Sequence, residues 1–153
     1  MKYSAKTIGY WISTASVVFV LATGGVADLL HRAGTAGGMT ELGYPTYVMT
    51  ILGFWKVLGA MAIAAPRFPL VKEWAYAGAF FDLTGGLASH IAHGSAWNHL
   101  LYTSLFAVAV VVSWALRPDN RRLGVAVFRG YGRVPELESV AQVRVSPPLH
   151  AAA

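Results

Sequence analysis

The amino-acid sequence predicts an all-α integral membrane protein, a four-helix up-down bundle followed by a cytoplasmic tail. Apolar residues make up 56% of the chain and charged residues only 12%, which is about half the charged share of a soluble domain. The mean hydropathy is +0.51. So few charges cannot cover a surface that faces water, and we therefore expect most of this surface to face lipid.

Four stretches are long and apolar enough to cross a bilayer, which takes roughly 20 mostly apolar residues. They are residues 8–30, 44–65, 70–93 and 97–116. Short connections join the last three, and short connections imply antiparallel neighbours. The first connection, residues 31–43, is rich in Gly, Thr and Ala and is expected to be a loop. Prolines stand at the ends of the stretches, where they break no internal hydrogen bond: Pro45, Pro66, Pro69 and Pro118.

Lys and Arg placement predicts the orientation. Basic residues flank the N-terminus, the turn at 66–69 and the end of the fourth stretch, whereas the opposite side has only Arg32. The positive-inside rule then puts both termini in the cytoplasm. The chain divides into a membrane domain, residues 1–117, and a basic, Pro-containing tail, residues 118–153. We expect the tail to be mostly disordered or to contact anionic lipid headgroups, with the apolar piece 123–128 on the membrane surface.

Several function classes are excluded. Cysteine is absent, so the chain supports no thiolate catalysis, disulfide exchange, Cys-ligated zinc or iron–sulfur cluster. Its sequence shows no nucleic-acid motif, and it has no HExxH, P-loop, GxGxxG or Ser-His-Asp order. Whether the protein is an enzyme is left open by these observations.

Lys56 and Asp82 are charged residues near the middle of two predicted spans. A charge at the centre of a spanning helix costs at least about 2.5–3.5 kcal/mol. Lys56 comes eleven residues after Pro45 and Asp82 twelve residues after Leu70, so both fall near the bilayer midplane. Because the two helices are antiparallel neighbours, we expect a buried ion pair. The pair either fixes the helix register or supplies polar contacts and proton transfer in a central pocket.

Further polar residues gather near the predicted outer face. Asp28 is expected to pair with a histidine, cap the loop or reach water. With His90, His93 and His99 it offers donor atoms that suit zinc, copper or iron, and histidines can also shuttle protons. The spacing is not diagnostic, so we expect neither a metal nor haem. The candidate ligand-binding residues are Lys56, Asp82, Asp28, His90, His93 and His99.

Two patterns predict packing and anchoring. Aromatic residues near the span ends, Tyr10 and Trp11 among them, are expected to be anchors at the membrane interface. A stripe of mainly small residues at steps of three or four is expected to face a neighbouring helix; it consists of Ala75, Gly78, Asp82, Gly86, Ser89 and His93.

An ordered run of segments resembles the DoxX-like family of small, mostly bacterial membrane proteins. The segments are Leu42-Gly-Tyr-Pro-Thr-Tyr, Leu52-Gly-Phe-Trp-Lys-Val-Leu-Gly-Ala, Pro66-Arg-Phe-Pro, Lys72-Glu-Trp-Ala-Tyr-Ala-Gly, Phe81-Asp-Leu-Thr-Gly and Ala88-Ser-His-Ile-Ala. The resemblance covers roughly residues 8–117, and Lys56, Asp82 and His90 match recurring positions of the family pattern. It implies a four-helix bundle in the bacterial inner membrane.

The resemblance also suggests a chemistry. The wider DoxX group takes its name from a subunit linked to thiosulfate oxidation with quinone as the acceptor, and other relatives are associated with redox assemblies in membranes. A quinone and a redox partner protein are therefore the implied ligand and partner. The absence of cysteine rules out a thiol relay within this chain.

Three functions are compatible with these observations. The first, which we favour, is the binding of a small hydrophobic molecule (a quinone or a lipid) inside the bundle, or service as an accessory subunit of a membrane redox assembly. The second is a membrane oxidoreductase or isomerase that uses Asp82 and the outer histidines for proton transfer. The third is a structural protein that assembles with a partner or with further copies of itself through the small-residue stripe.

Overall fold

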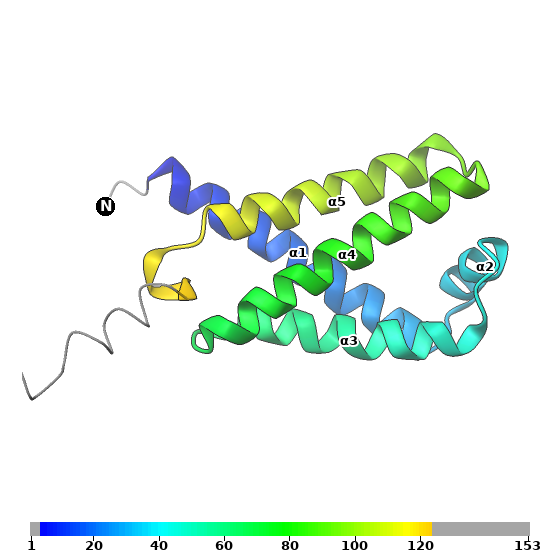
Figure 1. Cartoon of the computed structure of the whole chain (residues 1–153), viewed down its shortest axis with the longest axis horizontal. Helices are drawn as coiled ribbons and strands as arrows, with labels where there is room; N and C mark the ends of the chain where they lie inside the picture. The colour runs from blue at the N-terminus through cyan, green and yellow to red at the C-terminus, as the bar shows by residue number, and fades with distance from the viewer. Residues whose placement is uncertain (1–3, 124–153) are drawn as a thin grey trace, which may run out of the picture.

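The computed structural model describes residues 4–123, and this part of the chain is helical, without strands. Most of the predicted tail, residues 124–153, lies outside the described residues. Figure 1 shows the arrangement. The elements are α1 (Ala5–Leu29), α2 (Ala33–Glu41), α3 (Thr46–Ala64), α4 (Pro69–His93), α5 (Trp97–Ala115) and a short 3-10 helix, η1 (Asp119–Arg121).

The prediction of an all-α protein is confirmed for residues 4–123. The bounds of α1, α3, α4 and α5 lie within three residues of the four predicted spans. Among the described helices, α1, α3 and α5 are long and apolar enough to cross a membrane. The helix α4 is as long as α1 but less apolar, since it contains Lys72, Glu73 and Asp82. Four crossings in an up-down order therefore stay a prediction.

The expected loop at 31–43 is wrong, because α2 occupies most of it. Three glycines within nine residues lower its helix propensity, and none of its residues is buried, so no apolar period marks it. The helix is held locally. The Thr35 hydroxyl donates to the Arg32 carbonyl at 3.0 Å, and the Tyr44 amide donates to the Met39 carbonyl at 2.9 Å.

The four long helices pack around a small apolar core. The helices α1 and α4 each contact both α3 and α5. Large apolar side chains also cover the outside: Phe19, Trp55 and Phe81 are 67%, 64% and 70% exposed. Such a surface suits a lipid environment. The core consists of Val17, Leu21, Ala60, Ile63, Tyr76, Ala79 and Val110.

Two sequence expectations about individual faces need correction. Tyr10 is not an interface anchor, since it is 1% exposed, whereas Trp11 beside it is half exposed. The small-residue stripe of α4 faces neighbouring helices only in part. Asp82 pairs with Lys56 of α3 and Gly86 lies near Thr103 of α5, whereas Gly78 and His93 are exposed. The fully buried residues of α4 are Lys72, Tyr76 and Ala79.

A buried lysine joins α3 to α4 across their tight turn. The Lys72 ammonium donates to the carbonyls of Ala62 and Ile63, both at 2.7 Å, and the residue is 1% exposed. Both carbonyls belong to the last turn of α3, where backbone acceptors lack helical partners. The residue four positions after Ala62 is Pro66, which has no N–H. Lys72 therefore replaces the missing donor.

We expect Lys72→Met to lower the free energy of unfolding by about 2 kcal/mol, because two buried carbonyls lose a charged donor. Denaturant titration of the protein in a mild detergent measures the change. Lys6→Met is the matched control, since Lys6 is exposed and its removal should change the free energy by less than about 0.5 kcal/mol. Equal effects of the two substitutions would contradict the proposed role of Lys72.

Candidate functional site

Lys56 lies between two carboxylates that come from different helices. Its ammonium donates to Asp28 Oδ2 of α1 at 3.0 Å and lies 3.6 Å from Asp82 Oδ2 of α4. The expected Lys56–Asp82 ion pair is confirmed. The expectation for Asp28 is wrong, because its carboxylate pairs with Lys56 rather than with a histidine, the loop or water. The structure thus joins α1, α3 and α4 through one charged cluster, Asp28–Lys56–Asp82.

Two facing glycines place Asp28 beside Lys56. A Cβ atom on Gly25 would lie 2.9 Å from the Gly53 carbonyl oxygen and 2.9 Å from Lys56 Cβ. A Cβ atom on Gly53 would lie 2.8 Å from the Gly25 carbonyl oxygen and 3.0 Å from Asp28 Cβ. Only the missing side chains let α1 and α3 approach so closely. Each charged residue therefore packs against the glycine of the opposite helix.

The charged cluster carries one negative charge in excess, since two carboxylates share one ammonium. Its side chains are mostly shielded: 9% of Asp28, 17% of Asp82 and 23% of Lys56 is exposed. An ammonium has three N–H donors, so the two carboxylates leave a donor for another acceptor. The cluster can take up one proton or one hydrogen-bond donor, and it can also donate to one acceptor.

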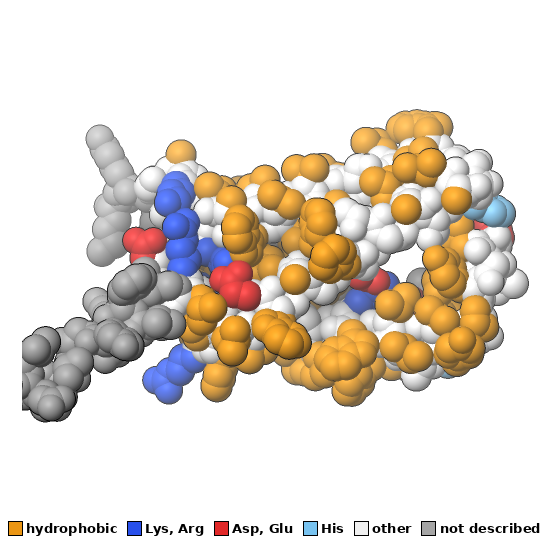
Figure 2. All heavy atoms as spheres, in the orientation of Figure 1, with side chains coloured by type: hydrophobic (Ala, Val, Ile, Leu, Met, Phe, Trp, Pro, Cys, Tyr) orange, Lys and Arg blue, Asp and Glu red, His pale blue; other side chains and the backbone are white. Residues whose placement is uncertain are grey.

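The cluster lies in a hollow on the side of the protein. Figure 1 shows α3 and α4 meeting at their tight turn and diverging toward the end where α2 lies. Figure 2 shows acidic and basic side chains together at the floor of the space between these two helices, with apolar side chains around its rim. The ion pair that joins α3 to α4 in this region is Lys56–Asp82. A polar floor with apolar walls is the usual construction of a small-molecule site.

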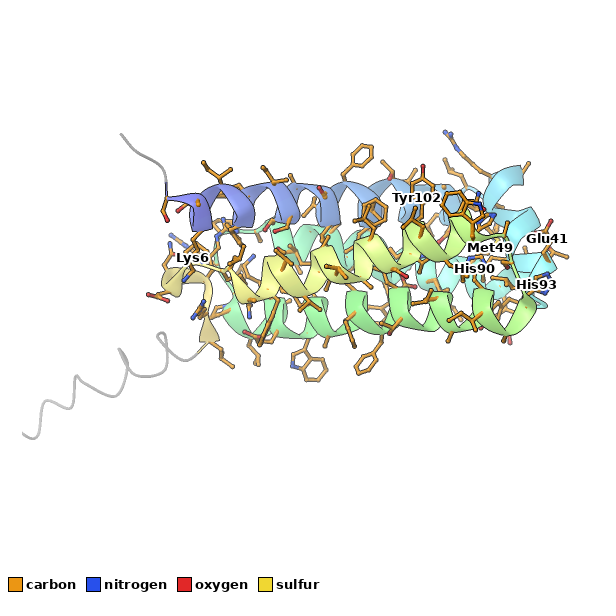
Figure 3. The ribbon with its side chains drawn as sticks, turned by 90° about the horizontal axis from the view of Figure 1, so that it is seen from above. Lys6, Glu41, Met49, His90, His93 and Tyr102 are labelled. Carbon is orange, nitrogen blue, oxygen red and sulfur yellow. The ribbon has the colours of Figure 1, made fainter. Side chains whose placement is uncertain are left out.

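The predicted histidine residues gather at the α2 end but do not join the charged cluster. Figure 3 shows His90 and His93 at the end opposite Lys6. The His90 and His99 rings stack at a centroid distance of 5.1 Å, and His90 Nδ1 lies 3.0 Å from the Ser95 hydroxyl. His93 is exposed. The structure therefore pairs His90 with His99 rather than with His93.

The described part of the chain does not have the arrangement of ligands that a metal site requires. Between residues 4 and 123, no three His, Asp or Glu side chains come together closely enough to hold an ion. Asp28, which would complete such a set, is bound to Lys56. The outer histidines are left as a stacked pair and an exposed neighbour.

The comparison with protein families identifies the chain. A family model described as the DoxX-like family matches residues 12–113. The chain belongs to the DoxX-like family. The matched segment includes all three residues of the charged cluster, and family membership together with the apolar helices establishes a membrane protein. Searches of curated proteins and of solved structures found no match.

This DoxX-like protein also contains a buried polar chain that the sequence analysis missed. The Ser113 hydroxyl of α5 lies 2.7 Å from the Thr14 hydroxyl of α1 and 2.7 Å from the Tyr76 hydroxyl of α4. All three residues are buried. Hydroxyl groups are common in predicted spans and carry no charge, so only the three-dimensional arrangement brings these together. These hydrogen bonds connect α1, α4 and α5 in the half of the DoxX-like protein nearer its basic end.

Proposed function

We propose that this DoxX-like membrane protein binds a small hydrophobic molecule, a quinone or a lipid, in the hollow between α3 and α4. The observation that carries the proposal is the charged cluster Asp28–Lys56–Asp82 at the floor of that hollow. The apolar walls would supply most of the affinity, and the cluster would fix the orientation of the polar end.

The donors and acceptors of the cluster suit a quinone. Lys56 offers an N–H donor to a ring carbonyl, and Asp82, which is the more distant carboxylate at 3.6 Å, can accept from a ring hydroxyl. The same pair therefore suits both the oxidised quinone, which has ring carbonyls, and the reduced quinol, which has ring hydroxyls. A membrane-soluble quinone also agrees with service as an accessory subunit of a redox assembly, the role that we propose for the protein.

We further propose that α4 crosses a bacterial inner membrane together with α1, α3 and α5. Basic side chains gather at one end in Figure 2, and Figure 3 places Lys6 at that end, far from Glu41, His90 and His93. The positive-inside rule then assigns the basic end to the cytoplasm. The three charges of α4 lie either near this end or within the charged cluster, which supports its insertion.

Decylubiquinone binding to the purified full-length protein in maltoside detergent tests the proposed ligand. We expect saturable binding that Asp82→Asn weakens about tenfold, because a carboxylate acceptor becomes an amide. This substitution keeps the 3.0 Å pair between Lys56 and Asp28, so folding should survive. Thr84→Ala is the matched control on α4, since the Thr84 hydroxyl donates to the carbonyl of Phe80 in its own helix.

The outcome separates the two ligand classes. Loss of decylubiquinone binding in Asp82→Asn but not in Thr84→Ala supports the quinone. Mass spectrometry of the protein after mild extraction tests the lipid, which should be retained by the unmodified protein and lost from Asp82→Asn. If neither molecule binds, or if both substitutions weaken binding equally, the proposal fails.

A structural role is the second candidate, and the glycine contact favours it. Lys56 is held by two carboxylates directly beside the close approach of Gly25 and Gly53. A charged group in that position can fix the register of α1 against α3. Replacing all three charges together distinguishes this role from ligand binding, since uncharged polar and apolar residues preserve the packing but remove the ligand contacts.

A further inference from the structure

A second charged cluster lies at the basic end of the protein and takes no part in the proposed function. Figure 2 shows blue side chains gathered there, with few red ones among them. Two of the cations are buried, Lys72 at 1% and Arg117 at 3% exposure, and both Arg117 and Arg121 lie close enough to Lys72 to repel it. A buried cation needs bonded acceptors around it.

Arg117 has more donors than the surrounding residues satisfy. Its Nε donates to the Trp114 carbonyl at 3.1 Å, and its Nη2 donates to Glu73 Oε1 at 2.7 Å. Its guanidinium carbon lies 4.9 Å from the centre of the Tyr76 ring. The remaining nitrogen, Nη1, is buried and has no hydrogen-bond partner within residues 4–123. Two N–H donors of a charged group are thus left without an acceptor.

In the part of the chain that the structure describes, the neighbouring side chains do not offer the missing acceptor. Glu73 is already used at both oxygens, since Trp114 Nε1 donates to Oε2 at 2.8 Å. Lys72 has no acceptor to offer, because its ammonium group only donates, and it donates to two carbonyls. Arg121 donates to the Tyr10 hydroxyl at 3.1 Å and lies over the Trp11 ring at 5.2 Å.

The charge balance at this end is positive. Lys72, Arg117 and Arg121 carry three positive charges, against one negative charge on Glu73. Arg122 and Asp119 lie 3.8 Å apart and balance each other. Among the described residues, two positive charges are therefore uncompensated, beside a guanidinium nitrogen that has no partner there. An anion with several acceptor oxygens would satisfy both the charge and the donors.

We propose that the basic end binds a phosphate group, with Arg117 Nη1 as the inner donor and Arg121 as the outer one. Arg121 is only half-buried, and its long side chain can turn from the Tyr10 hydroxyl to admit the anion. The phosphate comes either from an anionic lipid headgroup or from free phosphate. The site lies beside the half-exposed Trp11 and Trp114, so intrinsic fluorescence reports its occupancy.

The experiment uses delipidated full-length protein in maltoside detergent, which contains no phosphate. Inorganic phosphate is titrated in one arm, with potassium chloride of equal ionic strength as its blank. Phosphatidylglycerol is added to the micelles in the other arm, with an uncharged galactolipid as its blank. We expect a saturable change of Trp fluorescence in one arm, and Arg121→Gln should weaken binding about tenfold, the loss expected for a charge-assisted hydrogen bond.

Arg67→Gln is the matched control, since Arg67 is exposed at the same end and its loss removes the same charge. Arg117→Gln should abolish the fluorescence change if that variant folds, and if it does not, Arg121→Gln decides. A response to inorganic phosphate assigns free phosphate, and a response to phosphatidylglycerol alone assigns the headgroup. No saturable response in either arm, or equal weakening by Arg67→Gln and Arg121→Gln, overturns the proposal.

Discussion

Lys56→Met should lower the free energy of unfolding by about 3–5 kcal/mol, the largest effect that we expect from a single substitution in this protein. The ammonium holds Asp28 at 3.0 Å and Asp82 at 3.6 Å. Removing it leaves two shielded carboxylates close together without a counter-charge, and breaking a buried ion pair from one side costs about that much. Denaturant titration in a mild detergent, followed by circular dichroism, measures the loss.

The triple variant Lys56→Met, Asp28→Asn, Asp82→Asn should recover most of this stability. It removes all three charges while preserving the shapes of the side chains, and such a replacement is often neutral. A triple variant as unstable as Lys56→Met would mean that the ions themselves hold the helices together. A stable triple variant that no longer binds decylubiquinone would instead favour a ligand-binding role for the charged cluster.

Gly53→Ala should lower the free energy of unfolding by about 2–3 kcal/mol, although alanine is the better helix former. The new Cβ would lie 2.8 Å from the backbone oxygen of Gly25, and a backbone atom cannot turn aside as a side chain can. The two helices α1 and α3 must separate, with the cost of an overpacked interior. The separation should also lengthen the contact between Lys56 and Asp28.

Gly24→Ala provides the matched control, because a Cβ at Gly24 meets nothing within 4 Å. Gly24 lies beside Gly25 on the same helix, and its replacement should raise stability slightly, by up to about 1 kcal/mol. The two substitutions thus have opposite expected signs in the same denaturant titration. The close contact between α1 and α3 would be refuted by a Gly53→Ala variant that is as stable as Gly24→Ala.

The long helices could be predicted because length and hydropathy determine them almost alone. The bounds of α1, α3, α4 and α5 follow the apolar runs and the prolines beside them. The pairing of Lys56 with Asp82 was predictable for a related reason, since depth along antiparallel neighbours follows from counting residues. Both inferences use one coordinate, the distance along a helix axis.

The remaining features depend on rotation about that axis and on the distance between helices. Asp28 contacts Lys56 only because Gly25 and Gly53 let α1 and α3 approach closely, and a sequence does not say which glycines face each other. The helix α2 has neither a buried face nor an apolar period. The contacts of Lys72 and Arg117 required the positions of individual carbonyls and rings.

The divergence of α3 from α4 also has a consequence for how affinities should be measured. The hollow opens on the flank of the molecule rather than at either end, so a compound dissolved among the acyl chains would reach it by lateral diffusion without passing through water. Its occupancy would follow the mole fraction of the compound in the bilayer, not its aqueous concentration. Dilution with extra phospholipid at a fixed bulk concentration should therefore empty the site.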